Sequence, residues 1–148
     1  MGHVLMENRR GQAIEAEPTR AAGHAERLAA LAIIEWTVRT KHASFGGDKG
    51  CDTRNFVMEL CEINITPHVA HSTSSRHSAI DSGTTRHAGN SVNQRIRMRI
   101  EEVFGWTKIA DNLRKTRHRG LERVRWVFTL TAAAYNPIRL PKLLAAAP

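Results

Sequence analysis

The segment RIRMRIEEVFGWTK, residues 95 to 108, places two adjacent glutamates inside one of the most basic stretches of the chain, with an aromatic pair close behind them. On a helix that turns about 100° per residue, the apolar side chains around these glutamates fall on one arc, the face that would meet a core. Those side chains are Val92, Ile96, Ile100, Val103 and Phe104. The pattern predicts an amphipathic helix over residues 92–110.

The two glutamates differ in where this helix would place them. Glu101 projects at the edge of the apolar arc, on one line with Arg97 and Lys108. Glu102 points to another face, near arginines of the preceding turn, and is predicted to be a surface ion-pair residue. Geometry alone leaves two interpretations of Glu101 open. It is either an ordinary helix salt-bridge residue or a carboxylate that faces a site while neighbouring cations hold phosphates.

The charge of the chain is unevenly distributed. The 148 residues carry 22 Lys and Arg against 14 Asp and Glu, a net charge of +8. Residues 92–148 hold 12 basic and 4 acidic side chains, so the first 91 residues hold 10 of each. Such a distribution is expected of a surface that meets phosphates, with a solvated basic face as the alternative. The densest basic stretch is LRKTRHRG, residues 113–120.

Several classes of protein are disfavoured by composition. Cys51 and Cys61 make neither a disulfide framework nor a paired zinc spacing, and the histidines between residues 68 and 87 match no zinc pattern. The N-terminus lacks the apolar run of a signal peptide. The most hydrophobic run, from Trp126, is shorter than the ~20 residues of a spanning helix. We expect a soluble, cytoplasmic protein with one domain and no membrane partner.

Residue periodicity predicts an α/β order of elements. A hairpin is expected over residues 3–17, a helix over 21–39, and a short buried strand that ends at Asp48. A helix capped by Asp52 and a strand over residues 65–70 follow, and such a unit favours parallel pairing through a right-handed crossover. Residues 71–91 are predicted to be a polar loop. A last helix follows residue 120, and Pro137 and Pro141 are expected to limit it.

Long segments of the chain resemble a known family. They resemble the C-terminal two thirds of insertion-sequence transposases of the DDE class, in the insertion-sequence-five group, and the resemblance runs from Met1 almost to the end. The segments that carry it are GGDKGCDTRNF, NITPHVA, SAIDSGTTRH, RIRMRIEEVFGWTK and LRKTRHRGLERVRWVFTLTAAAYN. The resemblance implies a ribonuclease H-like catalytic domain, a mixed sheet with flanking helices, that cuts and joins DNA at transposon ends. Residues 1–70 would form the partial sheet with helices, 71–91 the polar loop, and 92–148 the helical basic part of one domain.

The resemblance also implies site residues. The second acidic residue of the family's triad matches Asp48, and the third matches Glu101, with Arg97 and Lys108 at the spacings of the family signature. Both carboxylates would hold catalytic Mg²⁺, two ions in the family. The signature often has a tyrosine where this chain has Gln94. The connector between the last two helices is expected to contact DNA phosphates through Arg114, Lys115, Arg117 and Arg119.

The first acidic residue of that triad has no match, since residues 1–47 contain no aspartate. We expect a chain that lacks the family's first strand, an incomplete two-metal site and impaired catalysis. Glu7, Glu15 and Glu17 are predicted to be surface positions of the hairpin, and Trp106 and Trp126 core aromatics. The alternatives are a non-catalytic DNA-binding or inhibitory remnant and a decayed product without a role. The expected partners are transposon-end DNA, at the bacterial nucleoid, and further copies of the chain or an intact transposase.

Overall fold

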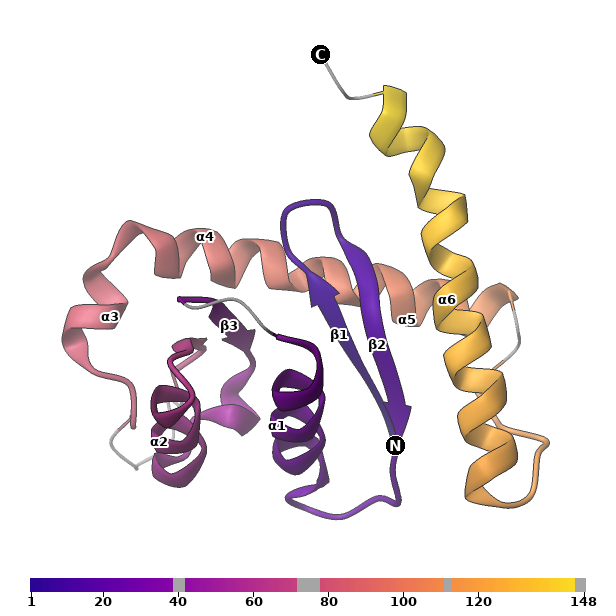
Figure 1. Cartoon of the computed structure of the whole chain (residues 1–148), viewed down its shortest axis with the longest axis horizontal. Helices are drawn as coiled ribbons and strands as arrows, with labels where there is room; N and C mark the ends of the chain where they lie inside the picture. Colours follow the sequence, from indigo (N-terminus) through magenta and orange to yellow (C-terminus); the bar gives the residue numbers. More distant parts are fainter. Residues whose placement is uncertain (39–41, 72–77, 111–112, 146–148) are drawn as a thin grey trace. The chain divides into compact units, whose positions relative to one another are not determined.

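A computed structural model describes residues 1–38, 42–71, 78–110 and 113–145 of the chain (Figure 1). The chain divides into two compact units, Met1–Thr37 together with Arg99–Pro148, and Val38–Met98. The helices and strands, in chain order, are β1 (Gly2–Glu7), β2 (Gln12–Pro18), α1 (Ala25–Thr37), β3 (Ser44–Gly47), α2 (Arg54–Glu62), β4 (Thr66–Val69), α3 (Ser82–Arg86), α4 (Ala88–Ile96), α5 (Ile100–Ala110) and α6 (Leu121–Ala145). The α/β class predicted from the sequence is confirmed.

The strands pair two by two. β1 and β2 are antiparallel, whereas β3 and β4 are parallel, so the described strands form two two-stranded sheets. The sequence predicted a mixed sheet, but these hydrogen bonds form two separate two-stranded sheets. Each pair closes locally, the first through a short turn and the second through the helix that connects its strands.

The hairpin begins the first unit, as predicted. Its turn contains Gly11 at φ 68°, a left-handed conformation that favours glycine. The carboxylate of Glu7 accepts hydrogen bonds from the backbone N–H groups of Arg9 and Arg10, at 2.8 and 2.7 Å. The turn therefore has its backbone donors satisfied by a side chain of the strand that precedes it.

Helix α6 covers the free edge of β2 (Figure 1). The Asn136 amide accepts a hydrogen bond from Ala13 N–H at 2.9 Å and donates one to the Ala13 carbonyl at 2.7 Å, as a neighbouring strand would. Thr129 donates to the Ala16 carbonyl at 3.1 Å. Below these bonds, Phe128 and Ala132 pack with Ala16 in the core of this unit. Covering an edge strand with a helix removes a site of unwanted strand pairing.

The prolines do not end α6, which was the expectation from the sequence. The helix runs 25 residues through Pro137 and Pro141 to Ala145. Both prolines lie on its exposed face, and each removes one backbone hydrogen bond. Contacts of Tyr135, Asn136 and Arg139 with the rest of the unit hold the helix together across the first proline. These tertiary contacts offset the free-energy cost of the backbone hydrogen bonds that the prolines remove.

Trp106 and Trp126 were both predicted to be core aromatics, but only one of them packs as expected. Trp106 packs edge-on against Tyr135, with ring centroids 6.0 Å apart, as expected of a packing aromatic. Trp126 is 68% exposed, so its predicted core position is wrong. It lies on the side of α6 opposite to Phe128 and Ala132, the residues that the helix buries. When a helix has two apolar faces, the residue type alone does not show which face is buried.

Helices α1 and α5 complete the first unit. α1 packs on the hairpin through Ala25, Ala29, Ile33 and Ile34, an i, i+4, i+8 pattern that agrees with the predicted helix. Leu28 and Trp36 of the same helix are exposed. In α5, which packs on α6, Val103 and Thr107 are the buried residues.

The second unit contains the predicted strand, helix and parallel strand. α2 buries Phe56, Val57 and Leu60, and the ring of Phe56 meets that of Phe45 in β3 edge-on at 5.6 Å. The predicted cap is wrong by one residue, because Thr53 precedes α2 as its N-cap. The carboxylate of Asp52 instead accepts hydrogen bonds from Ser78 Oγ at 3.1 Å and Ala79 N–H at 2.8 Å.

The predicted polar loop is partly helical. Its residues 72–77 lie outside the described part of the chain, but α3 and the start of α4 occupy residues 82–91. Asp81 and His87 cap these helices by accepting hydrogen bonds from Gly83 N–H at 2.7 Å and Gly89 N–H at 3.1 Å. The sequence predicted a loop because Ser, Thr, Asn, Asp and Gly are typical both of loops and of helix caps.

The helix predicted over residues 92–110 is interrupted. A 3₁₀ segment, Arg97–Arg99, separates α4 from α5. The regular projection of 100° per residue therefore does not extend across these three residues. Among the described residues, no helix combines the length and apolar composition needed to cross a membrane.

Candidate functional site

Asp48 lies directly after β3, at the carboxyl end of a parallel strand. It is exposed and acts as the N-cap of a short 3₁₀ turn, Lys49–Cys51. Its Oδ1 accepts a hydrogen bond from Gly50 N–H at 2.8 Å. This bond orients the carboxylate, while Oδ2 makes no hydrogen bond or ion pair within the described residues. The Asp48 carboxylate is therefore oriented by one hydrogen bond, and its second oxygen remains available to a ligand.

A polar bridge joins α4 to β4 in the same unit. Gln94 donates through Nε2 to the backbone carbonyl of His68, and its Oε1 accepts a hydrogen bond from Arg97 Nε at 2.8 Å. His68 is buried in β4, and its Nδ1 lies 3.2 Å from Asn90 Oδ1. Gln94 therefore ties the guanidinium of Arg97 to the backbone of a strand.

Sequence reasoning treated Gln94 only as a departure from the family signature. The signal that could have found the bridge is the recurrence of Asn90, Asn93, Gln94 and Arg97 at helical spacing, a polar stripe on one face of a helix. Such a stripe indicates a helix that contacts backbone groups at a sheet rather than an apolar core. Its importance was hidden because the partner is a carbonyl group of β4.

Glu101 lies in the first turn of α5 and is exposed. Its carboxylate makes no hydrogen bond or ion pair within the described part of the chain. Lys108, seven residues later in α5, is also exposed. The structure therefore does not use Glu101 as a helix salt-bridge residue.

Glu102 behaves differently from its neighbour, as predicted. It forms an ion pair with Arg139 of α6, at 2.6 Å, and accepts a hydrogen bond from the Tyr135 hydroxyl at 3.3 Å. Burial raises the pKa of Tyr135, so its hydroxyl keeps the proton that it donates at neutral pH. The prediction of a surface ion-pair residue is confirmed, but the partner comes from another helix rather than from the preceding turn.

The donor set agrees with the chemistry of a hard divalent cation. Mg²⁺ prefers carboxylate oxygens and water, and Asp48 and Glu101 both offer exposed carboxylate oxygens without a competing cation. Asp48 belongs to the unit Val38–Met98, and Glu101 to the unit that contains Arg99–Pro148.

Three of the basic residues in the last third of the chain serve the fold. Arg99 donates to the backbone carbonyls of Asn8 and Arg9 in the hairpin turn, at 3.3 and 3.2 Å. Arg139 donates to the Arg10 carbonyl at 2.7 Å besides pairing with Glu102. These hydrogen bonds join the hairpin turn to α6 and to the 3₁₀ segment that precedes α5.

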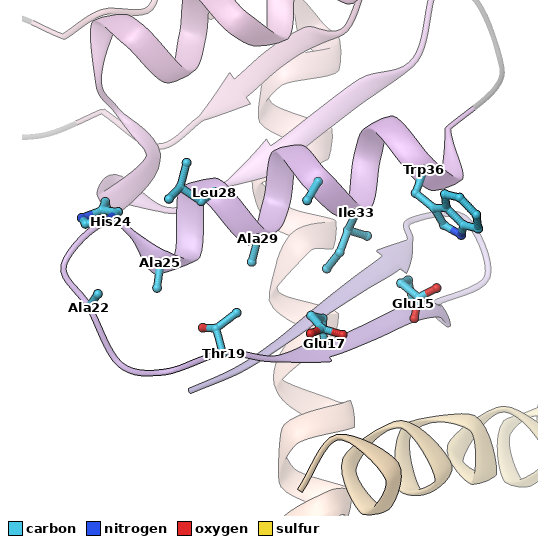
Figure 2. A pocket seen from close by; sticks show the side chains of 11 residues that line it. Glu15, Glu17, Thr19, Ala22, His24, Ala25, Leu28, Ala29, Ile33 and Trp36 are labelled. Atoms are coloured by element: carbon cyan, nitrogen blue, oxygen red, sulfur yellow. The ribbon is translucent and has the colours of Figure 1, made fainter. Parts of the chain in front are cut away.

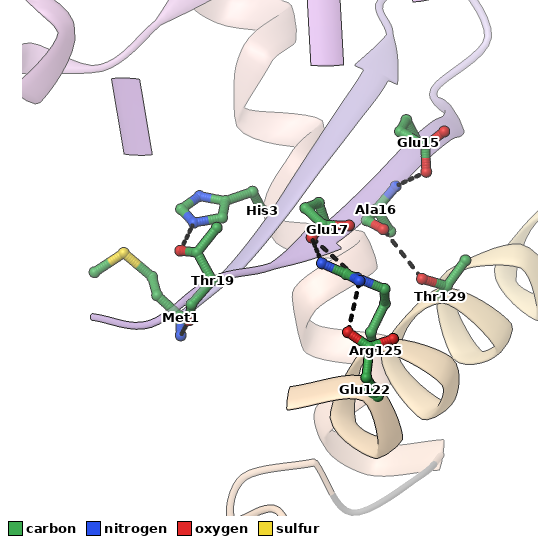
Figure 3. A network of polar contacts seen from close by, with 9 residues as sticks. All are labelled: Met1, His3, Glu15, Ala16, Glu17, Thr19, Glu122, Arg125 and Thr129. Carbon is green, nitrogen blue, oxygen red and sulfur yellow. Dashed lines mark hydrogen bonds and ion pairs between the residues drawn. The ribbon is translucent and has the colours of Figure 1, made fainter. Parts of the chain in front are cut away.

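Arg125 is the third structural arginine, at the centre of a network between α6 and β2 (Figure 3). It contacts Glu17 of β2 at 2.7 Å and Glu122 of α6 at 2.8 Å. The hydrogen bond from the guanidinium to Glu17 raises the pKa of Arg125. Glu17, predicted as a surface position, thus anchors α6 to the strand.

The connector before α6 has the opposite character. Residues 114–120 are exposed and form no helix or strand. Its four cations make no ion pair within the described residues: they are Arg114, Lys115, Arg117 and Arg119. The charge of the connector is therefore available to a polyanion.

The first unit also contains an open groove between α1 and β2, about 630 Å³ in volume (Figure 2). Ile33, Ala29, Leu28 and Trp36 of α1 line one side, and Glu15 and Glu17 of β2 line the other. Within the first unit, neither Glu101 nor a cation of the connector lines this groove.

Comparison with known protein families decides the assignment. A family model described as "Transposase DDE domain" matches residues 49–141, more than half of the chain. The chain belongs to the transposase DDE domain family. The match includes Arg97, Glu101, Lys108 and the whole connector, and it begins one residue after Asp48. No curated protein and no solved structure matches the chain.

Proposed function

We propose that this DDE domain contributes Asp48 and Glu101 to a divalent-metal site and binds DNA at transposon ends, for cleavage and strand transfer. The proposal is carried by one observation. A carboxylate stands at the carboxyl end of a parallel strand, oriented by Gly50 N–H, in a chain that matches the transposase DDE domain. Members of this family act on DNA with divalent metal ions, and Mg²⁺ is the ion that we propose here.

The order of elements supports a ribonuclease H-like domain of the insertion-sequence-five group. A hairpin, a helix, a strand, a helix and a parallel strand precede the helix that carries Glu101. We propose that residues 1–148 act as one catalytic domain. Residues 1–70 and the helices that follow them would supply Asp48 and the Gln94 bridge, and residues 92–148 would supply Glu101 and the DNA contacts.

Each residue has a defined task in this proposal. Bound divalent ions would stabilise the charge that develops on the attacking and leaving oxygens of a phosphodiester. Asp48 and Glu101 offer the oxygens that hold such ions. Gln94 keeps the Arg97 guanidinium oriented through the hydrogen bond at 2.8 Å, and Lys108 adds a cation on the helix of Glu101. The connector binds DNA phosphates away from the phosphodiester that reacts.

Catalysis by these 148 residues is proposed to be impaired. Two-metal chemistry needs a carboxylate that bridges the ions, and residues 1–47 offer no aspartate for that role. The three glutamates of the hairpin have other contacts. Glu7 accepts hydrogen bonds from the hairpin turn, Glu17 pairs with Arg125, and Glu15 accepts a hydrogen bond from Ala16 N–H at 3.0 Å. We expect weak metal binding and little strand transfer.

The test compares two similar aspartates. Asp48 and Asp81 are both exposed N-caps that accept a hydrogen bond from the backbone N–H of a glycine two residues later. Mn²⁺ titration of the full chain should show weak binding that Asp48→Asn abolishes and Asp81→Asn retains. Equal binding in both variants would refute the metal site. Metal-dependent nicking that disappears in Asp48→Asn would instead show that two carboxylates suffice for cleavage.

A second function, DNA binding without catalysis, is favoured by the unpaired cations of the connector. Such a protein would occupy transposon ends in the bacterial cytoplasm, or assemble with an intact transposase and inhibit it. Its binding should fall with salt and stay unchanged when a chelator removes divalent ions. Binding that needs Mg²⁺ and survives high salt would contradict this function.

A further inference from the structure

Helix α6 has a second apolar face that the other elements of its unit do not bury. The residues of this face recur at alternating spacings of four and three, the repeat of a helix–helix seam. We call it the α6 stripe, and its members are Trp126, Leu130, Ala133, Pro137, Leu140 and Leu144. All six are exposed. The four large side chains are 68%, 54%, 46% and 70% exposed, in chain order.

The α6 stripe lies opposite the face that packs on the hairpin and α5. At about 100° per residue, its six members fall within about 80° of arc. The centre of that arc is roughly half a turn from Phe128, Ala132 and Tyr135, which are the buried side chains of the other face. A surface helix of a globular protein needs only one apolar face. The second face therefore calls for a partner.

We propose that the α6 stripe pairs with the same stripe of a second copy of this chain, with the two helices antiparallel. A seam of this spacing is self-complementary, so one two-fold axis can satisfy both copies. The exposed parts of the four large side chains amount to roughly 500 Å² per copy, which is more than half of the ~800 Å² per partner of a standard interface.

Charge selects the antiparallel direction. Arg123 continues the spacing of the α6 stripe by one position before Trp126, and it makes no ion pair within the described residues. In a parallel pair the two Arg123 side chains would face each other across the seam and repel. In an antiparallel pair they lie at opposite ends of the interface, and the helix dipoles also oppose each other.

The antiparallel register also agrees with side-chain size. Centring the two-fold axis on the middle of the α6 stripe sets Trp126 against Leu144 and Leu130 against Leu140. The smaller Ala133 and Pro137 then meet at the centre, where the two backbones come closest. Large side chains thus fill the ends of the seam and small ones its middle.

The test uses two aliphatic residues of α6 with nearly equal exposure, Leu130 at 54% and Ile138 at 53%. Ile138 lies about 120° around the helix from the centre of the α6 stripe. Sedimentation equilibrium of the full chain should show a dimer whose dissociation constant rises at least roughly 30-fold in Leu130→Glu. Ile138→Glu should leave it within about threefold. A monomeric parent chain, or equal losses in both variants, would overturn the proposal.

Cross-linking tests the direction of the helices. In a Cys61→Ser background, which removes the exposed native thiol, a mixture of the Leu130→Cys and Leu140→Cys variants should form a disulfide between the two different chains on oxidation. Each variant alone should cross-link far less. Efficient cross-linking of Leu130→Cys with itself would refute the antiparallel arrangement. DNA binding by the connector is measured separately, so failure here leaves the proposed function intact.

Discussion

Removing the charge of the connector should weaken DNA binding far more than its share of the net charge would suggest. The perturbation replaces Arg114, Lys115, Arg117 and Arg119 with glutamine. All four side chains are exposed, and none has an acidic partner within the described residues. They can therefore meet phosphates without first breaking an ion pair.

The magnitude follows from counterion release. Each cation that neutralises one phosphate of a duplex contributes about 0.9 to the slope of log affinity against log salt concentration. Four such contacts make up a slope of roughly 3.6, which corresponds to about a thousandfold in affinity at roughly 0.15 M salt. The variant should lose this slope and this affinity together.

The assay is fluorescence anisotropy with a labelled duplex over roughly 50 to 300 mM salt. A control variant that replaces Arg9, Arg10, Arg20 and Arg54 with glutamine removes the same charge from exposed positions outside the connector. Its slope should change by less than about one. If both variants lose the same slope, binding follows net charge and the role of the connector is refuted.

Three further predictions concern the fold. Gln94→Leu removes the hydrogen bonds that join α4 to the His68 carbonyl and to Arg97. It should lower the free energy of unfolding in urea by about 1–2 kcal/mol, whereas a similar loss in the exposed control Arg95→Leu would contradict the bridge. Arg139→Met should cost about 1–3 kcal/mol because it removes charge-assisted bonds of a guanidinium that is only 17% exposed; Glu102→Gln, which removes only one ion pair, should cost less than ~1 kcal/mol. Burial lowers the pKa of His3 from 6.5, and the positive chain terminus adds to this effect. The unfolded chain then binds this proton more readily, so stability should fall as pH drops below about 6.5, and His3→Gln should flatten the decline of the melting temperature between about pH 7 and 5.

Local order was largely predictable from the sequence. The hairpin, α1, and the strand, helix and parallel strand of the second unit follow from periodicity and turn residues. The helices and the hairpin depend on contacts within a few residues along the chain, which a pattern records directly. The parallel pairing follows from the order strand, helix, strand. The family was also accessible from sequence, because its motifs are contiguous segments.

The candidate site was accessible only in part. Asp48 and Glu101 were selected by motif and by position on a predicted helix, and their metal binding stays a prediction. The Gln94 bridge was missed because its partner is a backbone carbonyl group of His68, 26 residues away. No pattern of residue types identifies which backbone carbonyl a side chain will meet.

The sequence by itself determined the α/β order, the family and the concentration of positive charge in the last third of the chain. Only the tertiary structure decided that α6 continues through Pro137 and that Trp126 lies exposed. The physical reason is the range of the interactions. Asn136 meets Ala13 across 123 residues, and such contacts outweigh local preferences that a sequence pattern expresses. They also determined which arginines hold the fold together and which make no ion pair among the described residues.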